Sequence, residues 1–162
     1  MHLLARLLVP AVLATAAFAA TAQQQHRIDF VHMGGNDCPP CVWWRQNELP
    51  RLQAMPEYQR LHFHYVTKTI HSPVPPAFFF PADARHLQPV LAEASNGTKG
   101  SPHQALLVDG KVVDYWFGTG AGKGNADEIA RLVRAIEKGE PLGRETCLKL
   151  RTASKCKVRG PA

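Results

Sequence analysis

The chain has 162 residues, a formal net charge of +6, 45% hydrophobic residues and four cysteines. A chain of this length can bury one ordinary hydrophobic core but hardly two, so we expect a single globular domain. Lysine and arginine are spread along the chain, and the basic C-terminal end has no interleaved aromatic residues, which argues against a nucleic-acid partner.

The chain opens with the three-part pattern of a secretory signal. His2 and Arg6 come first, an apolar run covers residues 7–20, and small residues then precede a glutamine-rich stretch. We expect cleavage after Ala22, a periplasmic or secreted location, and no stable membrane insertion after cleavage. A retained membrane anchor is the competing interpretation, although the run is short and contains Pro10. Export places the cysteines in an oxidising compartment, where a reactive pair needs an upstream redox partner.

Residues 27–33 form a predicted buried strand, and the turn over residues 34–37 is expected to deliver the next residue to the surface. The motif Cys38-Pro39-Pro40-Cys41 follows, and a helix is predicted from it to about residue 55. Two cysteines separated by two residues can close into a disulfide and reopen with little backbone movement. A helix N-terminus stabilises a thiolate, so Cys38 is the expected nucleophile and Cys41 the resolving cysteine.

The two prolines between the cysteines remove two amide donors from the first turn of that helix. If Cys38 is the N-cap, the amide of Cys41 is the first that can reach its sulfur, so we expect a thiol pKa only moderately below about 8.5. A less stabilised thiolate makes the reduced form less favoured, which biases the pair towards acting as a reductant. Of the two tryptophans that follow the motif, Trp43 is the candidate to line a substrate groove while Trp44 enters the core.

The next elements predict a helix between two parallel strands. Residues 61–66 alternate apolar and polar side chains as a strand does, and the helix before them should kink or end at Pro50. A helix that joins two strands in this way indicates a right-handed βαβ unit. A loop rich in proline and phenylalanine covers residues 71–81, and a second helix is predicted over residues 82–94.

The last part of the domain predicts a hairpin and a helix. Two apolar runs, over residues 104–108 and 111–117, are joined by an Asp-Gly dipeptide, which favours a tight hairpin turn. Asn125 is the expected N-cap of a final amphipathic helix, and Gly139 is the expected stop.

This order of elements resembles the thioredoxin-like superfamily from about Arg27 to Gly139. The resemblance depends on the CPPC motif and on Ser101-Pro102-His103, which is similar to the cis-proline loop of that family. It implies an α/β fold with a central mixed β-sheet flanked by helices, over residues 23–140. It also implies a cis peptide bond before Pro102, and a substrate backbone that pairs with this loop. His103 then either contacts the partner peptide or is a hydrogen-bonded structural histidine.

The resemblance implies thiol–disulfide exchange through a mixed disulfide at Cys38 that Cys41 resolves, with no bound cofactor or metal. The expected partners are exported proteins that carry cysteines or disulfides. Two positions depart from the family pattern: Asp37 replaces a tryptophan and His32 replaces a buried acid. His32 can shuttle a proton for Cys41 near neutral pH, whereas Asp37 would raise the pKa of Cys38.

Three alternatives concern the cysteines. A thioredoxin-like copper chaperone would use the same cysteines, because soft thiolates suit Cu(I). A static disulfide that never turns over is the second alternative. The third concerns Cys147 and Cys156 in the basic extension over residues 141–162, which we expect to form a structural disulfide but which could be a second redox pair.

Overall fold

A computed structural model describes residues 26–119 and 124–142 of the chain. The predicted signal segment and the predicted disulfide between Cys147 and Cys156 lie outside these residues, so both stay predictions. Among the described helices, none is long and apolar enough to cross a bilayer.

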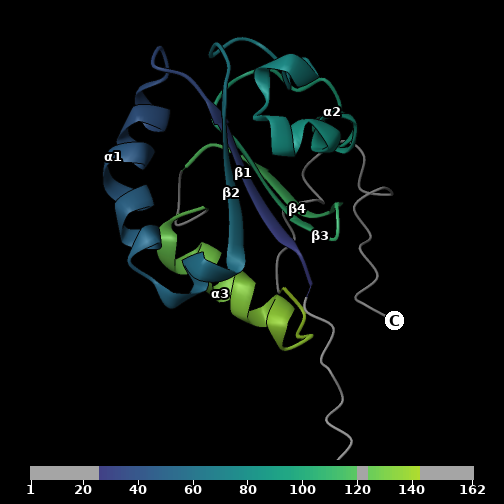
Figure 1. Ribbon diagram of the computed structural model, residues 1–162. Coiled ribbons are helices and arrows are strands. Elements are labelled where there is room, and N and C mark those ends of the chain that lie inside the picture. The colour runs from purple at the N-terminus through teal and green to yellow at the C-terminus, as the bar shows by residue number, and fades with distance from the viewer. Residues whose placement is uncertain (1–25, 120–123, 143–162) are drawn as a thin grey trace, which may run out of the picture.

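The centre of the molecule is a four-stranded mixed sheet with the order β2-β1-β3-β4 (Figure 1). Strand β1 (Ile28–Gly34) pairs in parallel with β2 (Leu61–Thr67) and antiparallel with β3 (His103–Val108). Strand β3 in turn pairs antiparallel with β4 (Lys111–Phe117). Helix α1 (Pro39–Gln53) joins β1 to β2, so the predicted βαβ unit is confirmed.

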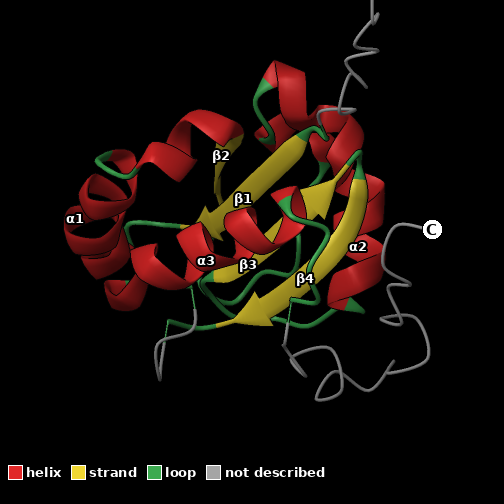
Figure 2. Cartoon of the chain, turned by 90° about the horizontal axis from the view of Figure 1, so that it is seen from below, coloured by secondary structure: helices red, strands yellow, loops and turns green. Residues whose placement is uncertain are grey.

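Helices cover both faces of the sheet, as Figures 1 and 2 show. Helix α1 and helix α3 (Ala126–Glu137) pack on one face, against a core that contains Phe30 and Trp116. Helix α2 (Gln88–Ser95) packs on the other face, against a core that contains Val31. Successive strand residues therefore point to opposite cores, as the pleat of a sheet requires. The expected α/β architecture, a mixed sheet flanked by helices, is confirmed.

Two elements differ from the sequence-based expectation. Pro50 does not end α1, which continues to Gln53 because a proline in the last turn removes only one donor from the helix. The predicted helix over residues 82–94 is divided into a 3₁₀-helix, Ala82–Leu87, and then α2. Pro89 explains the division, since it lies in the first turn of α2, where its missing N–H leaves no bond unmade.

The hairpin and the last helix match their predictions. Asp109 and Gly110 both have positive φ angles, 50° and 75°, as the tight turn between β3 and β4 requires. Asn125 caps α3, and its side-chain oxygen accepts a hydrogen bond of 2.9 Å from the amide of Glu128.

Candidate functional site

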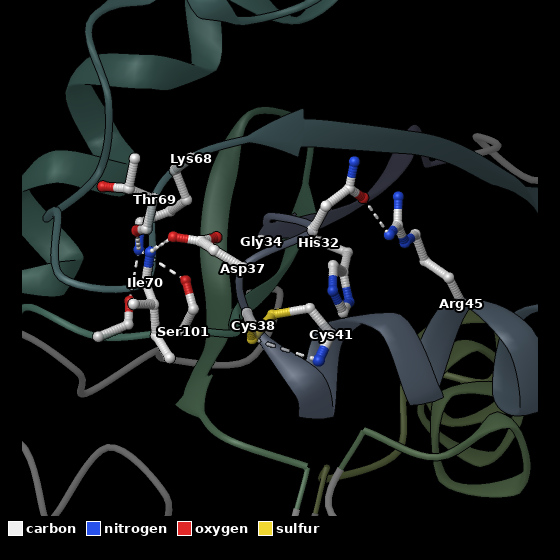
Figure 3. The surroundings of a disulfide bond; sticks show 12 residues. His32, Gly34, Asp37, Cys38, Cys41, Arg45, Lys68, Thr69, Ile70 and Ser101 are labelled. Carbon is white, nitrogen blue, oxygen red and sulfur yellow. Dashed lines mark hydrogen bonds between the residues drawn. A yellow bond between two sulfur atoms is a disulfide. The ribbon is translucent and has the colours of Figure 1, made fainter.

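Cys38 and Cys41 form a disulfide at the N-terminus of α1, with an S–S distance of 2.03 Å and a Cα–Cα distance of 5.2 Å (Figure 3). Cys38 is the N-cap of the helix, and the amide of Cys41 donates a hydrogen bond of 3.2 Å to its sulfur. Because Pro39 and Pro40 have no N–H group, this amide is the first donor that the helix offers. The predicted N-cap geometry is therefore confirmed.

The disulfide is buried, which differs from the sequence-based expectation. Both cysteines have a relative exposure of 0%, whereas Pro39 and Pro40 between them are exposed. The prediction that the turn over residues 34–37 brings Cys38 to the surface is wrong for the disulfide-bonded state. Exchange with another protein thus requires the Cys38 sulfur to become accessible beside the exposed prolines.

Gly34, the last residue of β1, explains how closely the disulfide packs on the sheet. A methyl group at this position would lie 2.6 Å from Cys41 Sγ and 2.9 Å from Cys41 Cβ. These distances are far below ordinary van der Waals contacts of about 3.5–4.0 Å. The absence of a side chain at Gly34 therefore allows the first turn of α1 to rest directly on the strand.

The predicted proline loop lies at the same end of the sheet as the disulfide. Met33 on β1 pairs with His103 on β3, so the next residues outward, Gly34 and Pro102, lie beside each other. The Ser101–Pro102 peptide bond is cis, as predicted. The carbonyl oxygen of Pro102 accepts a hydrogen bond of 2.9 Å from the amide of Gly118 after β4. The loop is thus held between β1 and the end of the hairpin.

Lys68, a residue that sequence reasoning missed, holds this loop from the other side. It is 5% exposed, and its Nζ donates to Ser101 Oγ at 2.9 Å, to Thr69 O at 3.2 Å and to Gly100 O. Burial lowers the pKa of Lys68 to about 8, while the nearby carboxylate of Asp37 acts in the opposite direction. A lysine directly after a half-buried strand was the only signal of this role in the sequence.

Asp37, directly before Cys38, is directed away from the sulfur. Its Oδ2 accepts a hydrogen bond of 3.0 Å from the amide of Ile70, and Figure 3 shows the carboxylate turned towards that segment. The carboxylate ties the turn before the disulfide to the segment after β2.

His32 lies on β1 beneath the first turns of α1. Its ring stacks on Trp44 with a centroid distance of 4.2 Å and on Tyr65 at 5.5 Å. His32 Nδ1 lies 2.8 Å from Gln104 Nε2, whereas Nε2 is buried and has no hydrogen-bond partner among the described residues. Burial lowers the pKa of His32 to about 3, with a smaller contribution from the positive charge of Arg45, so the ring is neutral at physiological pH.

His103, the other candidate histidine, is also buried. Its Nδ1 lies 2.5 Å from Tyr115 Oη, and its ring packs edge-on against Phe117. Burial, with a smaller effect of Lys68, lowers the pKa of His103 to about 4. This environment favours the structural interpretation of His103 over direct contact with a partner.

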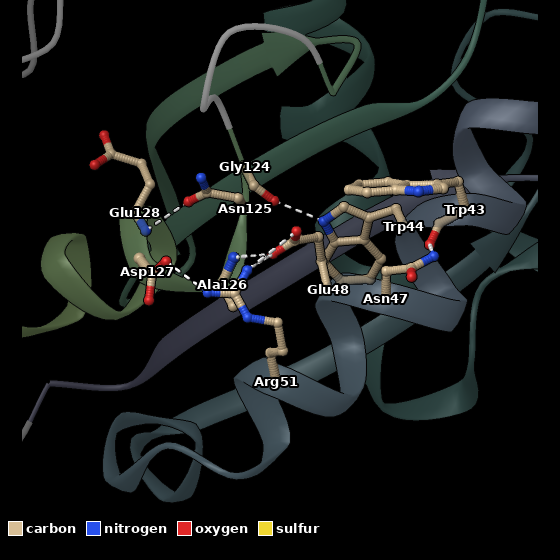
Figure 4. Close-up of polar contacts among 10 residues, drawn as sticks. All are labelled: Trp43, Trp44, Asn47, Glu48, Arg51, Gly124, Asn125, Ala126, Asp127 and Glu128. Carbon is tan, nitrogen blue, oxygen red and sulfur yellow. Dashed lines mark hydrogen bonds and ion pairs between the residues drawn. The ribbon is translucent and has the colours of Figure 1, made fainter.

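The two tryptophans after the motif take different positions, as expected. Trp43 is 50% exposed, whereas Trp44 is fully buried and donates a hydrogen bond of 2.6 Å from Nε1 to Gly124 O (Figure 4). Glu48, one turn further along α1, accepts a hydrogen bond of 2.9 Å from the amide of Ala126 at the start of α3. These two contacts on the buried face of α1 hold this helix, which carries both cysteines, against the segment that begins α3.

A second exposed aromatic side chain lies over the proline loop. Phe117 is 48% exposed, and its ring occupies the space into which a side chain at Gly100 would point. Trp43 follows the disulfide on α1 and Phe117 ends β4 beside the proline loop, so exposed aromatic surface is present on the cysteine-bearing helix and next to the loop. Such amphipathic surface is common where a protein contacts another polypeptide.

The described residues contain no group of three or more histidine, cysteine, aspartate or glutamate side chains that could hold a metal ion. His62 and His64, which share a strand face, differ in environment: His62 is exposed, and His64 is buried and lies 2.9 Å from Asp29. The copper interpretation therefore depends on the two cysteines and the neighbouring His32.

Comparisons of the sequence with protein-family models, with curated proteins and with solved structures give no match.

Proposed function

We propose that the protein is an exported thiol–disulfide oxidoreductase of the thioredoxin-like superfamily that exchanges disulfides with cysteines of other exported proteins. The observation that carries the proposal is a disulfide at a helix N-terminus in which the Cys38 sulfur accepts the amide hydrogen of Cys41. A sulfur in this position is stabilised as a thiolate, the form that attacks disulfides. The neighbouring proline loop and the exposed Trp43 offer surface for the partner chain.

The reaction proceeds in two exchanges. The Cys38 thiolate attacks a disulfide of the partner, so the bond between Cys38 and one partner sulfur forms while the other partner sulfur leaves as a thiolate. The Cys41 thiolate then attacks Cys38 Sγ, the mixed disulfide breaks, and the second partner thiolate leaves. The partner gains two electrons, and an upstream dithiol reductant restores the Cys38 and Cys41 thiols. Among the residues that the structure describes, the amide of Cys41 is the one donor to Cys38 Sγ, and this supports the reducing direction because the thiolate receives only moderate stabilisation.

Burial of the disulfide limits access and is the one observation that favours a second candidate, a structural disulfide without turnover. The two candidates differ in a direct assay. The full chain with dithiothreitol should accelerate insulin reduction, and Cys38→Ser should abolish the acceleration. The matched control is Cys147→Ser/Cys156→Ser, which should retain it. Two results together would support the structural disulfide instead: the wild-type protein does not accelerate insulin reduction, and its Cys38–Cys41 disulfide resists dithiothreitol in the folded state.

A further inference from the structure

Three polar side chains form a row across the sheet behind the disulfide. His32 on β1 is the register partner of Gln104 on β3, which is the register partner of Trp116 on β4. The three side chains point to the α1 face, where Trp116 Nε1 lies 2.5 Å from Gln104 Oε1 and Gln104 Nε2 lies 2.8 Å from His32 Nδ1. All three residues are buried, so these are contacts without competing solvent.

Hydrogen-bond chemistry gives this row one direction. An indole N–H can only donate, so the side-chain oxygen of Gln104 must face Trp116 and its amide nitrogen must face the histidine. An amide nitrogen can only donate, so His32 Nδ1 must be the acceptor and carries no proton. In the neutral imidazole the proton is then on Nε2.

The row has no room to rearrange. A side chain at Gly124, which has a φ of +68°, would overlap Gln104 Oε1 and Trp116 Nε1, so the backbone of Gly124 closes directly over this pair. Rotation of the Gln104 amide by 180° would set two donors against each other at Trp116. The tautomer of His32 is therefore fixed by the surrounding fold.

The protonated nitrogen faces a space at Gly34 that the resolving cysteine also borders. His32 Nε2 and Cys41 Sγ border the same small space above Gly34, since a methyl group there would lie 3.3 Å from the nitrogen and 2.6 Å from the sulfur (Figure 3). Nε2 has no acceptor among the described residues while Cys41 is in the disulfide. The other groups around the ring are Trp44 and Arg45 on α1 and Tyr65 on β2, whose hydroxyl donates to Gly34 O.

We propose that His32 donates a hydrogen bond from Nε2 to the Cys41 thiolate of the reduced protein, and that Gln104 and Trp116 are positioning residues that hold His32 in this tautomer. The proposal rests on the proposed function and deepens it. Cys41 loses its proton to water and then attacks Cys38 Sγ, while His32 keeps its own proton throughout. This role differs from a proton shuttle, in which Nε2 would have to accept the thiol proton with a lone pair that it does not have.

The hydrogen bond compensates for the cost of ionising Cys41 in a buried site. Burial alone raises a thiol pKa, which would leave little thiolate near neutral pH. A charge-assisted hydrogen bond counteracts this effect by lowering the thiol pKa by about one unit, which is a tenfold change in the acid dissociation constant. The same tautomer withholds the Nε2 lone pair from a metal ion, so it also disfavours His32 as a Cu(I) ligand.

The first test compares two substitutions of His32 in the full chain. His32→Gln places an amide N–H near Nε2 and cannot act as a base, whereas His32→Phe keeps the stacking on Trp44 and cannot donate. The probe is 5,5′-dithiobis(2-nitrobenzoate), which reacts with the reduced protein in two phases: attack by Cys38, and then release of the bound thiol by Cys41. We expect His32→Phe to slow the second phase about tenfold and His32→Gln to slow it less than threefold. The first phase should be unchanged in both variants, which controls for misfolding. Equal slowing of the second phase by both variants, or no slowing by either, would overturn the proposal.

The second test needs no variant. Long-range proton–nitrogen correlation spectra of the wild-type protein distinguish protonated from unprotonated ring nitrogens. We expect Nε2 of His32 to be protonated and Nδ1 unprotonated near pH 7, and the opposite tautomer would overturn the proposal. Neither test uses a protein substrate, so a failure of insulin reduction would reject the proposed function and leave this result intact.

Discussion

Gly34→Ala tests how the disulfide packs on the sheet. The added methyl group would lie 2.6 Å from Cys41 Sγ, against about 3.5–4.0 Å for an ordinary contact, so sulfur and strand must separate by about 1 Å. Overpacking of this kind costs about 1–3 kcal/mol. Alanine restricts the unfolded chain more than glycine does, which returns about 0.4–1 kcal/mol. We expect the free energy of unfolding to fall by about 1–2 kcal/mol.

The assay is urea denaturation within a double-mutant cycle. In the Cys38→Ala/Cys41→Ala background the sulfur contact is absent, so at least about 0.5–1 kcal/mol of the Gly34→Ala cost should disappear. Gly35→Ala is the matched control, because its methyl group would meet the carbonyl oxygen of Lys68 rather than the disulfide. Its cost should be equal in both backgrounds. An equal cost of Gly34→Ala with and without the sulfurs would show that the disulfide does not pack against Gly34 in this way.

Three further predictions concern pH, the proline loop and the partner surface. His32 and His103 have folded-state pKa values of about 3 and about 4, below the unfolded value of 6.5, so the unfolded chain binds more protons below pH 6.5. The free energy of unfolding should therefore fall as pH decreases from 6 to 4.5. The slope of this fall should approach about 1.4 kcal/mol per pH unit for each histidine. Urea titrations of His32→Gln should show about half of the wild-type slope. Lys68→Met should lower stability by about 1–3 kcal/mol, because Ser101 Oγ and two carbonyl oxygens lose their donor, and unchanged thermal unfolding would contradict this role. Trp43→Ala should raise KM for insulin reduction severalfold without changing stability. Phe78→Ala is the control: it removes an even more exposed aromatic side chain that lies outside the cysteine helix, and it should leave KM unchanged.

Local chemistry in the sequence predicted much of the fold and the core of the site. The missing N–H groups of the two prolines were enough to identify the amide of Cys41 as the first donor to Cys38, because this geometry is confined to one helical turn. The Asp109-Gly110 turn and the Asn125 cap were predictable for the same reason. Burial of the disulfide was not predictable, because it depends on the close packing of α1 against Gly34. That contact exists only once the sheet has folded.

The hydrogen-bonded row behind the disulfide depends on an irregularity that the sequence does not reveal. A regular hairpin closed by Asp109 and Gly110 would pair Gln104 with Tyr115. The structure has a register shift after Leu106, so Gln104 pairs with Trp116 instead. This shift turns Trp116 to the same face as His32 and Gln104, and thereby fixes the tautomer of the histidine. Pattern reasoning could place His32 near Cys41 but could not identify which nitrogen carries the proton.

The central claim is that Cys38 forms a mixed disulfide with another protein, and trapping that intermediate tests it most directly. The reduced Cys41→Ser variant cannot resolve the intermediate. Incubation with a disulfide-bonded exported protein, followed by mass spectrometry under non-reducing conditions, should give a covalent adduct at Cys38 that Cys38→Ser/Cys41→Ser does not form. A folded Cys41→Ser protein that forms no adduct, and whose Cys38 also resists alkylation, would contradict the account.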